Sequence, residues 1–364
     1  MNTAALTAAL KEESQRLGFD LVGATPAIAP PDFDRLRQWL ADGHAGQMHY
    51  LANRLDAYRH PGRVLDGAKS ILMLGVNYRS VEPIAPGPGQ ASVSRYAWGD
   101  DYHEVIRGRL HKLADFHRQL VPASGVRGVV DTAPLLERQF GQLAGLGWIG
   151  RNTMLINERF GSWFFLAALL TTEKLAYDQP TASRCGVCRA CLDACPTGAL
   201  VEPFRLDARK CISYLTIELR GCPDFCANGA VPARNSVKGD SPIFADTKIG
   251  TVPELRDPIP TEFHNLAVCG HRLFGCDACQ EACPWNRNTP ASADPAFLPG
   301  SGMNPVELAE LAALDEAAFR QRFRHTPLWR AKREGILRNA RIIAEGREER
   351  GEGRGQEAGA RDKR

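Results

Sequence analysis

A run of four cysteines that ends in a proline is the part of the chain whose residue types and spacing most clearly indicate chemistry. It extends from Cys185 to Pro196 with the spacing C-x2-C-x2-C-x3-C-P. Bacterial-type ferredoxins use this run to hold iron–sulfur clusters, with the first three thiolates on one cluster and the fourth on a second. The run therefore predicts that further cysteine ligands lie elsewhere in the chain.

A shorter run with the spacing C-x2-C-x3-C-P begins at Cys276, and Leu273 stands where a further cysteine would fall. Two clusters with four thiolates each need one more cysteine than the two runs supply. We expect the last cysteine of each run to bind the cluster of the other run. One cluster would then be held by Cys185, Cys188, Cys191 and Cys283, and the other by Cys195, Cys276, Cys279 and one of Cys211, Cys222, Cys226 and Cys269.

Zinc is the main alternative at these cysteines, because C-x2-C pairs also form tetrahedral zinc sites. A third and a fourth cysteine followed by proline are not needed for zinc, and the proline-terminated ending occurs twice. Disulfides fit less well, because a chain of 364 residues can bury a core without them and its N-terminal segment does not resemble a signal peptide. The spacing therefore favours clusters.

The overall composition is that of an ordinary globular protein, with 44% hydrophobic and 24% charged residues. The formal net charge of +3 is too small to indicate nucleic-acid binding by itself. No uncharged apolar segment approaches the roughly 18 residues that a membrane-spanning helix needs. We therefore expect a cytoplasmic protein with no membrane contact, since a reducing compartment suits so many unpaired thiols.

The first part of the chain alternates helical and strand-like segments, which predicts an α/β (α+β) domain over roughly residues 1–178. The cysteines predict a ferredoxin-like domain over 179–290, with 222–257 as an inserted loop. Residues 291–345 read as a basic helical region. Residues 346–364 contain no Val, Ile, Leu or aromatic residue and predict a disordered tail. We expect helices at about 6–17, 102–120 and 134–144, and strands at about 19–23, 70–76, 126–130 and 162–170.

Asp131 directly follows an apolar strand-like segment and precedes a helical one. Ligands commonly bind at the carboxyl ends of strands in α/β sheets. The alternative is that Asp131 or Thr132 caps the helix that begins near Pro134. In a closed apolar site, burial would favour the protonated carboxyl and suit Asp131 to general-acid catalysis.

The segment from Gly145 to Gly150 matches G-x-G-x-x-G, which nucleotide-binding folds place after a strand and before a helix. Here the order is reversed, so we interpret the segment as a glycine-rich turn from helix to strand. The histidines show no metal-ligand spacing, and we interpret them as ordinary surface or core residues. They are His44, His49, His60, His103, His111 and His117.

Residues 320–341 are rich in arginine, with Phe323 and Trp329 interleaved. Such a stripe can neutralise phosphates and offer stacking surfaces to unpaired bases, although many charge runs are only solvated helix faces. The candidate nucleic-acid contacts are Arg320, Arg322, Arg330, Lys332 and Arg338.

Five segments together resemble the epoxyqueuosine reductases: residues 131–138, 145–153, 160–166, 211–218 and 272–286. The resemblance implies a cytoplasmic, cobalamin-dependent enzyme with two [4Fe–4S] clusters that removes the epoxide oxygen of epoxyqueuosine at the wobble position of tRNA. It also implies a low-potential electron donor as partner, and we expect a monomer. The residues implied are Asp131 as proton donor, Cys211 as the eighth cluster ligand, and Arg54, Ser94, Asp131, Asn152, Leu155 and Ser162 around the corrinoid.

The chain departs from this pattern at residues 222–257, which resemble an insertion, and at a shorter C-terminus. Extra cysteines at 222, 226 and 269, with His264 and His271 nearby, could bind zinc or remain free thiols. Two other functions compete with the reductase. A corrinoid reductive dehalogenase would share the cofactors, and a two-cluster electron-transfer protein would need no catalytic Asp131.

Overall fold

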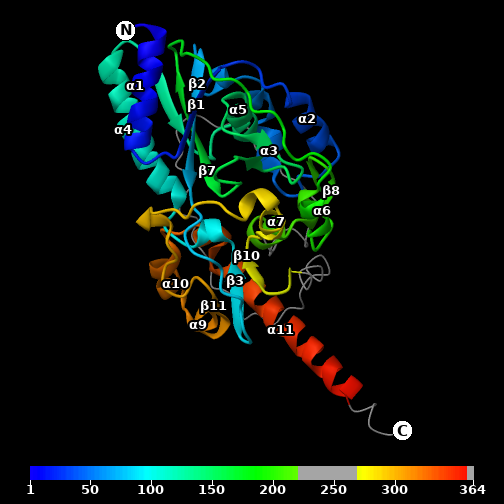
Figure 1. Ribbon diagram of the computed structural model, residues 1–364. Helices are drawn as coiled ribbons and strands as arrows, with labels where there is room; N and C mark the ends of the chain where they lie inside the picture. The colour runs from blue at the N-terminus through cyan, green and yellow to red at the C-terminus, as the bar shows by residue number, and fades with distance from the viewer. Residues whose placement is uncertain (220–268, 359–364) are drawn as a thin grey trace, which may run out of the picture.

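The computed structural model describes residues 1–219 and 269–358, and it describes side chains as far as residue 345 (Figure 1). The predicted insertion at 222–257, with Cys222 and Cys226, lies outside these residues. No helix among the described residues is long and apolar enough to cross a membrane.

The first half contains α1 (Thr3–Arg16), β1 (Leu21–Pro26), α2 (Phe33–Ala41), α3 (His49–Asn53), β2 (Ser70–Asn77), β3 (Gln90–Val93), α4 (Tyr102–Leu120), β4 (Val126–Val129), α5 (Glu137–Leu143), β5 (Trp148–Ile149), β6 (Leu155–Ile156) and β7 (Phe164–Thr171). The second half contains α6 (Ala190–Asp193), β8 (Leu200–Glu202), β9 (Arg205–Leu206), α7 (Ile212–Ile217), β10 (Arg272–Phe274), α8 (Ala278–Glu281), η6 (Pro284–Asn286), β11 (Val306–Glu307), α9 (Leu308–Ala313), α10 (Glu316–Phe323), η8 (Pro327–Ala331) and α11 (Lys332–Ala358).

A four-stranded sheet with the order β1-β2-β7-β4 forms the centre of the first half. The mixed α/β class is confirmed, but every strand pair in this sheet is antiparallel. β2 is buried along its whole length, so its sequence is a continuous apolar run. Such a run is typical of parallel strands, and apolar character alone could not reveal the strand direction.

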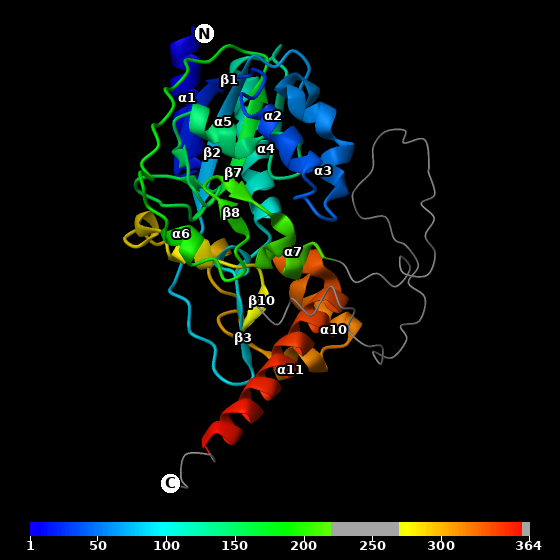
Figure 2. The same ribbon diagram turned by 90° about the vertical axis from the view of Figure 1, so that its right-hand side faces the viewer.

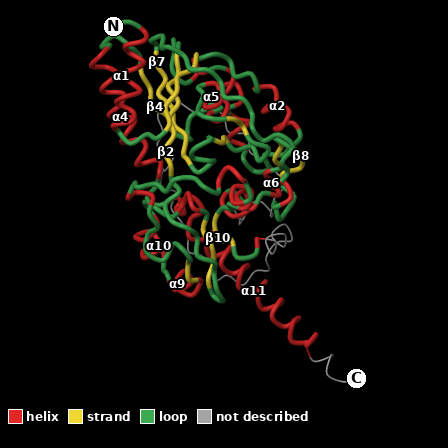
Figure 3. The backbone as a smooth tube through the Cα atoms, in the orientation of Figure 1, coloured by secondary structure: helices red, strands yellow, loops and turns green. Residues whose placement is uncertain are grey.

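Helices cover both faces of this sheet, with α1 and α4 on one face and α5 on the other (Figures 1 and 3). Alternate residues of β2 pack into the cores on the two faces of the sheet. Leu72 and Leu74 belong to the core beneath α1 and α4, whereas Ile71 and Met73 pack with the core around α5. The alternation follows from the two-residue period of a strand.

A second sheet draws on both halves of the chain. β3 pairs in parallel with β10 and antiparallel with β11, in the order β10-β3-β11. Helices α9, α10 and α11 pack against it around a separate core that includes Phe274 and Phe319. The chain between β2 and α4 therefore leaves the first sheet and joins the C-terminal elements, which the division of the sequence at residue 178 does not anticipate.

The C-terminal helix α11 continues to Ala358 and extends away from the body (Figure 1). The prediction of a disordered tail from residue 346 is therefore wrong as far as residue 358, and residues 359–364 lie outside the described part. Lack of apolar side chains excludes a buried helix but not an exposed one. Arg, Glu and Ala are good helix formers that need no core contact.

Asn286 in η6 ties the cysteine-bearing elements to the central sheet. Its Oδ1 accepts the Ser162 N–H at 2.6 Å, and its Nδ2 donates to Ser162 Oγ at 2.9 Å and to Gln280 O at 2.7 Å. The side chain is 4% exposed, so no water replaces these bonds in the folded protein. It fixes α8 and η6 against the entry to β7.

We expect Asn286→Ala to destabilise the protein by about 2 to 4 kcal/mol, because it leaves buried donors and acceptors unpaired. The measurement is the urea midpoint of unfolding of the cluster-loaded protein. Asn288→Ala is the matched control, since Asn288 is exposed and should leave the midpoint unchanged. Equal midpoints for Asn286→Ala and wild type would contradict this role.

Candidate active site

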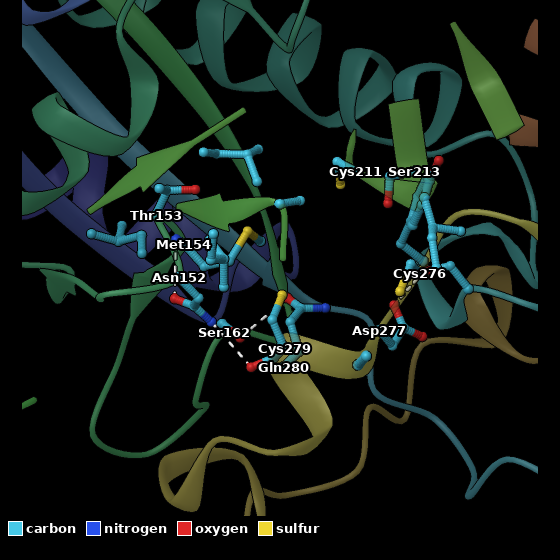
Figure 4. Close-up of a pocket in the computed structure, with 18 of the residues that line it drawn as sticks. Asn152, Thr153, Met154, Ser162, Cys211, Ser213, Cys276, Asp277, Cys279 and Gln280 are labelled. Carbon is cyan, nitrogen blue, oxygen red and sulfur yellow. Dashed lines mark hydrogen bonds between the residues drawn. The ribbon is translucent and has the colours of Figure 1, made fainter. Parts of the chain in front are cut away.

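A cavity of about 380 Å³ lies between the central sheet and the cysteine-bearing elements. Figure 4 shows Cys211 and Cys276 on one side of it, with Cys279, Ser162 and Asn152 on another. Aromatic and aliphatic side chains form most of the remaining wall, contributed by β7 and by the residues around β6. Of the described cysteines, those that line the cavity are Cys195, Cys211, Cys276 and Cys279.

The nine described cysteines are free thiols, and eight of them form two groups. In the first group, burial and then the neighbouring Cys283 thiol raise the pKa of Cys191 to about 11, with Cys185 adding to the effect. In the second, burial and then Cys276, Cys211 and Cys195 raise the pKa of Cys279. Cys283 thus lies with the first run and Cys195 with the second, which is the grouping that exchanged ligands require.

Cys269 is buried and packs with Cys211 and Cys276 without lining the cavity. Burial, followed by the Cys276 and Cys211 thiols, raises its pKa to about 12. Of the two candidate eighth ligands that the structure describes, Cys211 therefore faces the cavity with Cys195, Cys276 and Cys279, and Cys269 does not. Cys222 and Cys226 lie outside the described residues.

Asp131 lies at the cavity edge, directly after β4, with a left-handed φ of 53°. Its backbone N–H donates to Glu137 Oε1 at 3.0 Å, and this bond holds the turn. The alternative that Asp131 caps the following helix is wrong, because α5 begins only at Glu137. Left-handed backbone is unfavourable for a residue with a side chain, so its presence here suggests a functional demand.

Two side chains from the first turn of α4 bind the Asp131 carboxylate. Tyr102 donates its hydroxyl to Oδ2 at 2.9 Å, and His103 Nε2 lies 3.2 Å from the same oxygen. Asp101 caps α4 by accepting the His103 backbone N–H at 3.0 Å, and its Oδ1 lies 2.7 Å from His103 Nδ1. His103 therefore lies between two carboxylates.

The electrostatics place the proton on His103. Burial alone would lower its pKa, but the hydrogen bonds and charges of Asp101 and Asp131 raise it to about 9. For Asp131, burial raises the pKa, but His103 and Tyr102, together with the charge of Arg330, lower it to about 2. Near neutral pH the pair is thus an imidazolium and a carboxylate.

The pKa of Glu137 is shifted in the opposite direction from that of Asp131. Burial, then the Asp131 charge, raise its pKa to about 8. The two carboxyls share a small space, and ionisation of one disfavours ionisation of the other. Asp131 holds the negative charge because the imidazolium faces it.

The interpretation of His103 as an ordinary histidine is wrong. Asp101, Tyr102 and Glu137 are further site residues that the sequence did not reveal. A signal for part of this arrangement was present, because Asp-x-His at a helix start can place the cap carboxylate on the histidine ring. Nothing in the sequence indicated that Asp131 would lie on the other side of that ring.

The residues expected around a corrinoid lie in or beside this cavity. Ser94, Asp131, Asn152, Leu155 and Ser162 line it, whereas Arg54 does not and donates to Thr132 O at 3.1 Å. Two of their hydroxyls already have partners. Ser162 Oγ donates to Gln280 Oε1 at 3.1 Å (Figure 4), and Ser94 Oγ donates to Asp277.

The residues of the arginine-rich stripe differ in their exposure and in their contacts. Phe323 is buried in the C-terminal core, so the expectation that it could stack on bases is wrong. Arg322 binds Glu310 at 3.3 Å, and Arg338 donates to backbone carbonyls at the end of α7. Arg330 lies 2.6 Å from Glu218, with its charge felt at Asp131. Arg320 and Lys332 are exposed.

Comparison with known proteins agrees with this geometry. Residues 59–132 match the family described as epoxyqueuosine reductase QueG, DUF1730, and residues 184–224 match the 4Fe-4S double cluster binding domain. The first run and Cys211 lie within the second match, so the chain contains a two-cluster [4Fe–4S] domain.

Among curated relatives, the epoxyqueuosine reductase of Pseudomonas aeruginosa is 37% identical over 93% of this chain and 85% of its own length. That of Xanthomonas campestris is 36% identical over 92% and 85% of the two chains. The Escherichia coli reductase is 35% identical over 85% and 73%.

Solved structures of epoxyqueuosine reductases share the fold. One in complex with an epoxyqueuosine-modified tRNA-Tyr stem loop is 28% identical, with a TM-score of 0.76 over 94% of this chain and 81% of that one. A Bacillus subtilis reductase, captured with its catalytic aspartate loop swung out of the active site, has the same TM-score of 0.76. With relatives above one-third identity over most of both chains, the protein belongs to the epoxyqueuosine reductase family.

Proposed function

We propose that the protein reduces epoxyqueuosine to queuosine at the wobble position of tRNA, in the cytoplasm. The observation that carries the proposal is that one cavity is lined both by a carboxyl that can transfer protons and by cysteines that can hold an electron-transferring cluster. Asp131 approaches from the central sheet, and Cys195, Cys211, Cys276 and Cys279 approach from the cysteine-bearing elements. Reductive removal of an epoxide oxygen needs electrons and protons at one place, and this cavity brings together groups for both.

The cavity also suits a cobalamin. Its wall is mainly apolar and aromatic, with a few polar groups such as the Asn152 amide, as a large macrocycle with amide side chains requires. Ser94, Asn152, Leu155 and Ser162 would hold the ring, with Arg54 beside the Asp131 turn. Bound there, the corrinoid would supply a cobalt centre able to accept single electrons and react with an epoxide carbon.

The reaction consumes two electrons and two protons and releases the epoxide oxygen as water. The departing oxygen would be a poor leaving group without a proton. We propose that the His103 imidazolium is the source of this proton and that Asp131 relays it to the departing oxygen, through the 3.2 Å contact between His103 Nε2 and Asp131 Oδ2. Tyr102 and Asp101 hold the carboxylate and the ring in position for the transfer.

Arg330 is the candidate tRNA contact with the strongest positional support. It is exposed on η8, pairs with Glu218, and lies close enough to Asp131 to lower the pKa of that carboxyl. A nucleotide that places its base in the cavity must keep its phosphate outside, where a guanidinium can bind it. Arg320 and Lys332 remain candidates for more distant phosphates.

We expect Asp131→Asn to lower turnover by about 10²-fold or more, because the amide cannot relay a proton. The measurement is nucleoside mass spectrometry on epoxyqueuosine-containing tRNA after anaerobic incubation with cobalamin and a low-potential reductant. Iron content and corrinoid absorbance should be unchanged. Asp115→Asn on the exposed side of α4 is the control, and full activity of Asp131→Asn would refute the assignment.

We expect the His103 ring to titrate with a pKa of about 9, and Asp101→Asn to move it toward the ordinary value of about 6.5. The pKa is raised, so the imidazolium persists through neutral pH and is lost as the pH rises through 9. Activity should fall over the same range, and at lower pH in Asp101→Asn. NMR titration of the histidine ring protons measures the shift, and a wild-type pKa near 6.5 would contradict it.

We expect Arg330→Ala to weaken tRNA binding and to reduce the slope of log affinity against log salt by about one. The matched control is Arg322→Ala, because Arg322 lies beside Glu310 at a different cavity, whereas the charge of Arg330 acts on Asp131. Binding is measured by fluorescence anisotropy of a labelled anticodon stem loop at several salt concentrations. Equal slopes for Arg330→Ala and wild type would remove Arg330 from the interface.

A further inference from the structure

The loop formed by residues 184–189 exposes an apolar side chain next to a cluster ligand. Val187 is 92% exposed, and Cys188 beside it is the one exposed thiol among the described cysteines. Single exposed aliphatic residues are common and mean little alone. Here the valine lies within one turn of two cysteines of the first run, where an apolar contact would bring a partner close to the metal centre.

The inner and outer sides of this cysteine group differ. On the inner side, Cys185 and Cys283 pack with Trp148 and Trp285, whose ring centroids lie 5.0 Å apart. On the outer side, residues 186–189 are all exposed. The adjoining helix α6 lies at the right-hand edge of the molecule in Figure 1, on the side that faces the viewer in Figure 2. Access from solvent to this group is therefore from one direction.

The two cysteine groups also differ in their relation to the cavity. The second group lines it, whereas Cys185, Cys188, Cys191 and Cys283 do not. Electrons that enter at the first group would pass the second group before they reach the reacting atoms. The exposed loop is thus at the far end of the electron path from the chemistry.

Charge around the loop favours an acidic partner. Arg151 donates to Gly186 O at 2.6 Å, and Arg184 and Arg189 belong to the loop itself. Arg287 follows the turn that carries Trp285. The nearby carboxylates are Glu158, 2.6 Å from Arg184, and Asp193, 3.7 Å from Arg189. Both of these ion pairs are exposed, so their arginines can exchange partners with carboxylates of another protein.

We propose that the 184–189 loop, with Val187 at its centre and Arg184 and Arg189 around it, is the docking surface for a small acidic one-electron carrier protein. The proposal rests on the function proposed above and names the partner that supplies its electrons. The apolar centre with a charged rim and the small area suit a transient complex, whose rate of formation depends on complementary charge.

The transfer itself moves one electron and no atoms. The carrier's flavin or iron–sulfur centre is oxidised by one electron, and the cluster held by the first cysteine group is reduced by one. Two such encounters supply the two electrons that one epoxide consumes. No bond forms or breaks at the surface, so the contact needs proximity and orientation alone.

The test uses the cluster-loaded protein and a flavodoxin of strongly negative net charge, without tRNA. We expect Val187→Glu, and separately the double variant Arg184→Glu with Arg189→Glu, to slow flavodoxin-driven reduction at low salt by about tenfold or more. We also expect weaker binding of oxidised flavodoxin, measured by biolayer interferometry. Reduction by dithionite, which needs no docking surface, should be unchanged.

Ile84→Glu is the matched control, because Ile84 is an aliphatic residue 58% exposed on another surface. The double variant Arg184→Lys with Arg189→Lys keeps the charge and should retain the wild-type rate. Rates for wild type should fall with salt, and those for the double Glu variant should depend on salt less.

Wild-type rates and affinity in both Glu variants would overturn the proposal, as would failure of flavodoxin to reduce the wild-type protein. If Val187→Glu also slowed reduction of the protein by dithionite, the double variant Arg184→Glu with Arg189→Glu would decide whether the loop is the docking surface. Cluster reduction is measured without tRNA, so a negative result would contradict the docking surface and not the proposed tRNA reaction. Loss of the tRNA reaction would likewise not contradict the docking surface.

Discussion

The buried amide of Asn286 is the interaction on which the active site depends. The cavity exists because two parts of the chain, each with its own role, meet across it. Asn286 joins them by pairing with the backbone and hydroxyl of Ser162 and with the backbone of Gln280. A buried polar network of this kind specifies one arrangement, because any displacement leaves several donors and acceptors unpaired. A hydrophobic contact of similar area would tolerate sliding, and electron transfer into the cavity would then vary with the relative position of the two parts.

The second constraint acts on charge. Asp131, Glu137, Asp101 and His103 lie so close together that their protonation states depend on one another. A lone carboxyl in this apolar cavity would favour the protonated form, as the sequence-based argument assumed. The imidazolium reverses that preference by stabilising the carboxylate through a direct hydrogen bond. In the proposed mechanism His103 is therefore the acid at rest, and Asp131 would relay its proton to the substrate. The left-handed turn at Asp131 places its carboxylate against both Tyr102 and His103.

The sequence predicted the elements far better than it predicted their arrangement. Apolar periodicity located β2 and α4 almost to the residue, because burial of a strand or of a helix face requires a local pattern. It could not reveal that β2 and β7 run antiparallel, or that β3 pairs with β10 and β11 and not with the strands of the first sheet. The sequence of a strand does not specify which other strand it pairs with. The cysteine runs could be recognised in the sequence because the geometry of a cluster requires fixed spacing between its ligands. His103 was missed for the opposite reason. Its role depends on Asp131, which is far away in the chain, and only the fold brings the two side chains together.

The two cysteine groups differ in their surroundings, because one lines the cavity and the other reaches the molecular surface at Cys188. Cys195, Cys211, Cys276 and Cys279 line the cavity, and its mainly apolar wall shields them in part from water. The cysteines of the first group do not line the cavity. The first run begins in a loop where Gly186 adopts a positive φ of 52°, and the chain then turns into the short helix α6. A glycine at this position lets the backbone turn tightly beside Cys185 and Cys188, so their thiols can face a common point while Val187 faces solvent. In the proposed electron path, the exposed Cys188 would thus lie at one end and the cavity at the other, although the two cysteine runs share the same C-x2-C-x3-C-P spacing.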